Sequence, residues 1–136
     1  MQSTARSPLP TGIDGDIAAL NLESIAFKVC MDEGWNVEEV DNAEHDYRLF
    51  LQAVRRFPNE ALAPTKAIDV FWHHHILDTS KYTEDCARLF GRYIHHYPYS
   101  GVLSPQDAQE QEARFRRTQA LMTSIQENGD SDEQAV

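Results

Sequence analysis

The chain has 136 residues, of which 41% are hydrophobic and 25% charged, values typical of one globular domain with a single core. The 22 acidic and 12 basic residues give a net charge of -10, which argues against nucleic-acid binding and against attraction to anionic membranes. No apolar run approaches the ~20 residues needed to span a bilayer, and the N-terminus lacks the pattern of a signal peptide, so we expect a cytoplasmic protein.

Proline, glycine and capping residues divide the chain into about five helices with a loose segment at each end. Residues 1–13 are rich in Ser, Thr, Pro and Gly and are expected to be disordered, and the acidic residues 128–136 are expected to form a disordered tail. Helices are predicted over 16–31, 37–57, 64–77, 79–97 and 105–126. No stretch alternates like a strand, so the predicted fold is all-α, a single compact bundle over residues 14–127.

The segment from Asp69 to His75 carries the strongest functional signal, because it places three of the six histidines in a row. Imidazole is the commonest metal ligand and transfers protons near neutral pH. Asp69 and His73 are four residues apart and therefore lie on one face of a helix, where the carboxylate can orient the imidazole or bind a metal beside it. The simpler alternative is a hydrogen-bonded pair with no other partner.

Helix geometry limits which histidines can act together. Two residues correspond to about 200° of rotation, so His73 and His75 share one ion only if the helix unwinds between them. In a tight antiparallel hairpin with the next helix, His73 faces roughly Asp85 and Cys86, and His96 lies ~15 Å further along at ~1.5 Å per residue. A site that combines His73 with His96 instead requires a steep crossing of the two helices. Both arrangements stay open.

Several segments, 47–51, 62–65 and 69–78, occur together with Tyr82, Cys86, Gly91 and residues 95–98. Taken together they resemble the glycine-rich domain-containing protein-like family, a domain of unknown function with a Trp-His-x-His motif. The resemblance implies that His73, His75 and His96 are motif positions, whereas His74 is variable. Longer plant relatives carry a glycine-rich tail and are linked to development and stress responses, but this chain has only six glycines and no such tail, so those roles do not transfer.

Three functions compete. The first is a histidine-centred site that binds a transition metal, zinc or non-haem iron, and acts as a small metal-dependent enzyme on a small molecule; its ligands would be His73, His75, His96 and Asp69. The second is a non-catalytic interaction module whose histidines form a structural polar network and whose acidic surface binds a basic partner protein. The third is a metal-free acid–base enzyme with His73 and Asp69 as the catalytic pair.

Overall fold

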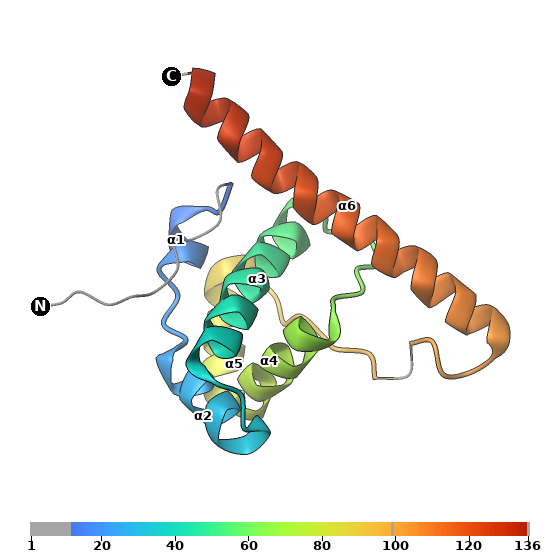
Figure 1. Cartoon of the computed structure of the whole chain (residues 1–136), viewed down its shortest axis with the longest axis horizontal. Helices are drawn as coiled ribbons and strands as arrows, with labels where there is room; N and C mark the ends of the chain where they lie inside the picture. Colours follow the sequence, from blue (N-terminus) through green and yellow to red (C-terminus); the bar gives the residue numbers. More distant parts are fainter. Residues whose placement is uncertain (1–11, 99, 136) are drawn as a thin grey trace, which may run out of the picture.

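The computed structural model describes residues 12–98 and 100–135, with backbone only for residues 128–135. This part of the chain contains no strand and six helices (Figure 1), which confirms the all-α prediction. None of these helices is long and apolar enough to cross a membrane. The disorder predicted for residues 1–13 falls mainly on residues 1–11, which lie outside the described residues. The helices are α1 (Gly15–Ala18), α2 (Glu23–Glu33), α3 (Val37–Arg56), α4 (Lys66–Leu77), α5 (Thr79–Phe90) and α6 (Pro105–Ala135).

The first predicted helix is split into α1 and α2. Leu20 and Leu22 are both buried, although residues two apart point in nearly opposite directions on a helix. The break allows both side chains to reach the core. The carbonyl of Ile17 accepts a hydrogen bond from Arg48 at 2.8 Å, so a side chain of α3 satisfies a group that a continuing helix would have used.

The last two helices also end where the sequence analysis did not place them. α5 stops at Phe90 because Gly91 adopts a left-handed conformation with φ of 71°, and its N–H bonds the carbonyl of Ala87. Residues 93–97, which were predicted to be helical, have no regular secondary structure. α6 continues to Ala135, beyond the predicted end at residue 126.

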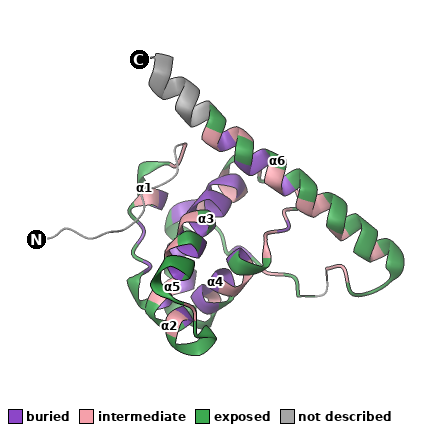
Figure 2. Cartoon of the chain, viewed as in Figure 1, coloured by how far each residue is buried: buried purple, intermediate pink, exposed green. Residues whose placement is uncertain are grey.

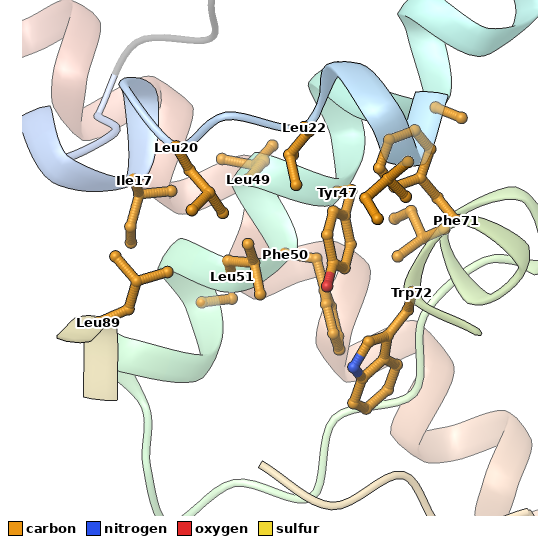
Figure 3. Close-up of a cluster of buried hydrophobic side chains, with 14 of the residues drawn as sticks. Ile17, Leu20, Leu22, Tyr47, Leu49, Phe50, Leu51, Phe71, Trp72 and Leu89 are labelled. Atoms are coloured by element: carbon orange, nitrogen blue, oxygen red, sulfur yellow. The ribbon is translucent and has the colours of Figure 1, made fainter. Parts of the chain in front are cut away.

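The core surrounds α3, which contacts α1, α2, α4 and α6. An Asn36–Glu39 capping box begins α3, and ten of its residues are buried, so it presents apolar side chains to several neighbours (Figure 2). Phe50 packs against Trp72 of α4 with ring centroids 5.2 Å apart. The cluster around these rings joins α1, α3, α4 and α5 (Figure 3).

α6 crosses the end of α3, and both ends of α6 extend past the rest of the molecule (Figure 1). Its attachment includes Thr118, which is fully buried and accepts a hydrogen bond from the backbone N–H of Ala63 at 2.8 Å. Further along, Ile125 is also fully buried. Gly12, with φ of 83°, approaches so closely that a Cβ there would lie 2.4 Å from the Ile125 carbonyl oxygen. α6 is therefore attached along its middle.

Candidate functional site

The antiparallel hairpin of α4 and α5 determines which polar side chains meet. Trp72 Nε1 donates to the Tyr82 hydroxyl at 2.9 Å, and His75 Nε2 lies 2.9 Å from Asp85 Oδ2. A tight hairpin was one of the two arrangements left open by the sequence, and within it the residue opposite Asp85 was expected to be His73. That expectation is wrong, because His75 is on the face of α4 that packs against α5 and His73 is exposed.

His75 belongs to a buried chain of hydrogen bonds from α3 to α5. Its Nδ1 lies 2.7 Å from the Tyr47 hydroxyl, and its side chain is 2% exposed. Burial lowers the pKa of His75 by more than its hydrogen bond to Asp85 raises it. The ring is therefore neutral near pH 7, with Nε2–H donating to Asp85 and Nδ1 accepting from Tyr47. This arrangement matches the structural polar network of the second hypothesis.

Asp85 completes this buried network and keeps its charge. Burial acts to raise the pKa of its carboxyl, but hydrogen bonds from His75, Lys81 and Arg88 outweigh it and hold the pKa below its usual value. The Lys81 ammonium is 3.0 Å and the Arg88 guanidinium 2.6 Å from the carboxylate oxygens. Because every polar atom in the chain Tyr47–His75–Asp85 has a partner inside the protein, the network stabilises packing and leaves no group for a ligand.

A second histidine–carboxylate pair is accessible. His96 Nε2 lies 2.5 Å from Asp69 Oδ1, and the two side chains are 22% and 46% exposed. The His96 ring packs edge-on against Trp72, with centroids 4.6 Å apart. Trp72 is itself held by its hydrogen bond to Tyr82, whose hydroxyl donates to the Ile94 carbonyl at 2.5 Å. The pair is therefore half exposed but fixed in orientation.

This Asp69–His96 pair lines a cavity of about 790 Å³. Its walls come from the first half of α4, the loop before it, residues 95–98, Ser100 and the first part of α6. Figure 1 shows how α6 and the long connection that leads to it enclose this side of α4. A smaller hollow of about 280 Å³ adjoins it and shares Leu62, Trp72 and His95 with it.

Some charged groups of the cavity wall already have hydrogen-bond or ion-pair partners, and others do not. Asp69 is bonded to His96, and Asp107 accepts hydrogen bonds from the backbone N–H groups of Gly101 and Leu103 at 2.8 and 3.2 Å. Arg114 lies 3.7 Å from Asp107. Lys66, in contrast, forms no hydrogen bond or ion pair with any residue that the structure describes. Its ammonium is therefore the cation of the cavity wall that is free to meet a ligand.

The four predicted site residues do not converge. Asp69 meets His96, whereas His75 is enclosed in the core and His73 is exposed, so the predicted catalytic pair of His73 and Asp69 is not formed. His73 and His75 point in nearly opposite directions because α4 stays helical through both residues. Among the described side chains, no group of three or more His, Cys, Asp or Glu is arranged to hold a metal ion.

Several other residues were not predicted to take part in the polar network or the cavity. His74, predicted to be variable, is buried and bonds Glu33 of α2 at 3.0 Å. Lys66 and Arg114 gave no local signal as cavity residues, because the cavity forms between segments far apart in the chain. The one available signal for the position of His96 was Gly91, a residue typical of helix C-termini, which ends α5 early.

Residues 28–134 match the model of the UCP032817-like family. The chain belongs to the UCP032817-like family. The resemblance to the glycine-rich domain-containing protein-like family is therefore wrong, since the matching model is a different one and spans nearly the whole helical domain. The UCP032817-like match includes the His75–Asp85 and Asp69–His96 pairs and every residue of the cavity. No curated protein and no solved structure matches the chain.

Proposed function

We propose that the protein binds a small molecule in the cavity between α4 and α6, and that Asp69 and His96 form its acid–base centre. The observation that carries this proposal is a hydrogen-bonded carboxylate–imidazole pair, 2.5 Å apart, on the wall of a cavity of about 790 Å³. Cavities of ~300–1,000 Å³ are the usual size for small-molecule sites. This proposal keeps the small-molecule ligand of the first hypothesis and the metal-free chemistry of the third, with His96 in place of His73.

The arrangement suits proton transfer. Asp69 accepts from the Nε2–H of His96 and so favours the tautomer with a lone pair on Nδ1. No described residue hydrogen-bonds this Nδ1. Contact with Trp72 holds the imidazole plane, so a bound substrate meets a base of fixed orientation. His96 is thus the group that would accept or donate the proton, and Asp69 the group that orients it.

Binding of zinc or iron stays a prediction. Asp69 and His96 supply one carboxylate and one imidazole, fewer protein ligands than the four proposed from the sequence. Elemental analysis of purified protein, repeated on His96→Gln, tests it: stoichiometric metal that the variant loses would support a metal on this pair.

A non-catalytic interaction module is the second candidate, and the buried His75 network favours it. This candidate expects no small-molecule binding at His96. A pull-down with basic partner proteins would be needed only if the cavity stays empty in the ligand screen described next.

The screen follows the histidine Cε1–H signals by NMR while anionic, neutral and cationic fragments are added. We expect at least one class to move the His96 signal saturably and to leave the His73 signal in place. His96→Gln should weaken binding roughly tenfold or more, the loss expected for one hydrogen bond to a charged or strongly polar group. His73→Gln is the matched control, because it removes an exposed histidine of α4 outside the cavity. If no fragment moves His96 more than His73, the proposal fails.

A further inference from the structure

The outer face of α2 is exposed although it is apolar. Ile25 and Val29 are buried against the core, whereas Phe27 and Met31 project from the opposite side of the helix, where they are 66% and 67% exposed. A helix that is apolar on two opposite faces is normally covered on both of them. The described residues leave the second face of α2 largely uncovered.

This exposed surface continues onto the start of α3. Val37, the first residue of α3, is 71% exposed, and only residues 34–36 separate it from the end of α2. A Cβ at Gly34 would meet nothing within 4 Å, so the turn between the two helices is open as well. Figure 1 shows α2 and this turn on the side of the molecule away from α6, and Figure 2 shows the turn as largely exposed. We call Phe27, Met31 and Val37 the α2 patch.

Negative charge surrounds the α2 patch. Residues 23–41 contain six acidic residues and one basic residue, a net charge of -5 out of -10 for the whole chain. Glu23 lies one turn before Phe27 on α2. Glu38 follows Val37 directly. Neither carboxylate forms a side-chain hydrogen bond or ion pair with any residue that the structure describes, so both are free to meet a cation.

We propose that the α2 patch docks a basic amphipathic helix of a partner protein. The apolar side chains of that helix lie against Phe27 and Met31, and its lysine or arginine side chains reach Glu23 and Glu38. A second copy of this chain fits less well, because two such surfaces facing each other bring like charges together. No residue of the patch lines the cavity described above, so this inference does not rest on the proposed function.

The test uses a synthetic helical peptide of about five turns with leucine on one face and lysine on the other. Isothermal titration calorimetry measures its affinity, and ¹H–¹⁵N NMR spectra show where it binds. We expect saturable shifts over residues 27–38 and none over residues 105–114 of α6. Two control peptides each lose one property, with glutamate in place of lysine or alanine in place of leucine. Each should bind roughly tenfold more weakly or not at all.

A pair of matched variants tests the apolar centre of the patch. Phe27→Ser combined with Met31→Ser should weaken binding of the lysine peptide roughly tenfold or more, the loss expected for two central anchors. Val102→Ser combined with Leu103→Ser is the control, because these two residues are as exposed but lie in the connection before α6. That variant should bind as the wild type does. Thermal melts confirm that each variant is folded.

A second pair tests the charged edges. Glu23→Gln combined with Glu38→Gln should weaken the lysine peptide about threefold, as expected for exposed charges at the rim of an interface. Glu110→Gln combined with Glu112→Gln removes the same two charges from α6 and should have a smaller effect. Equal effects of the two variants would show that only the net charge attracts the peptide, which overturns docking at the α2 patch.

Two other results would overturn the proposal. The first is a glutamate peptide, or a Phe27→Ser and Met31→Ser protein, that binds as tightly as the original pair. The second is a dimer in sedimentation experiments that the same two substitutions dissociate, because a second copy then occupies the patch. None of these measurements involves His96, so the small-molecule site is tested separately.

Discussion

Replacing Tyr47 by Phe isolates the hydrogen bond that links α3 to the buried histidine of α4. The ring stays and keeps its packing against Phe71, 5.2 Å away, so the change removes little more than one hydroxyl. That hydroxyl is 2.7 Å from His75 Nδ1, and both residues are buried. Losing the bond costs about 1 kcal/mol, and leaving a buried acceptor unsatisfied adds about 1–3 kcal/mol. We therefore expect the free energy of unfolding to fall by roughly 2–4 kcal/mol.

Urea denaturation followed by circular dichroism at 222 nm measures this loss. A matched control is Tyr93→Phe, because Tyr93 is 40% exposed. That variant should stay within about 0.5 kcal/mol of the wild type. A Tyr47→Phe protein as stable as Tyr93→Phe would refute the view that His75 depends on this donor.

The same network predicts a pH dependence. The pKa of His75 is lowered by burial, so between the folded value and about 6.5 the unfolded chain binds more protons than the folded one. The contribution of His75 to stability is therefore complete above pH 6.5 and decreases as the pH falls, by at most about 1.4 kcal/mol per pH unit. Asp85, whose pKa is lowered, loses its contribution only below about pH 4. An NMR titration in which His75 protonates at or above pH 6.5 would contradict this.

Three further substitutions test other parts of the structure by chemical denaturation. Asp85→Asn should lower the free energy of unfolding by about 3–5 kcal/mol because it breaks a buried ion pair. Arg88→Gln removes a side chain that is 71% exposed and should lower it by less than about 1 kcal/mol. Equal losses of stability in the two variants would contradict this. Gly91→Ala should cost about 1–2 kcal/mol through backbone conformation alone, since a Cβ there meets no neighbour, and an unchanged stability would argue against the left-handed end of α5. Thr118→Val should cost about 1–3 kcal/mol by leaving the N–H of Ala63 without its acceptor, and a variant as stable as the wild type would contradict this.

Local signals were enough to predict most of the helices. Pro58 follows the predicted end of α3, and Pro64 marks the predicted start of α4, two residues before Lys66. The break between α1 and α2 could not be predicted in the same way, because it depends on Arg48, 31 residues from the carbonyl it bonds. Helix boundaries that depend on such distant partners leave no mark in the local pattern.

The candidate site was predictable in part. Asp69 and His96 were both singled out, but Asp69 was paired with its helical neighbour His73. The pairing with His96 requires α5 to stop at Gly91 so that the following residues run back along α4. The cavity itself was not predictable, since Arg114 reaches it from a helix whose course depends on tertiary packing.

A site enclosed partly by α6 couples occupancy to the docking of that helix. Arg114 lies on the cavity wall, but α6 is fastened further along, through Thr118 and Ile125. A molecule in the cavity would bridge two parts of the protein and would add about 2.7 kcal/mol to their association at a concentration one hundred times its dissociation constant. By reciprocity, anything that pulls α6 away would release the ligand by the same factor.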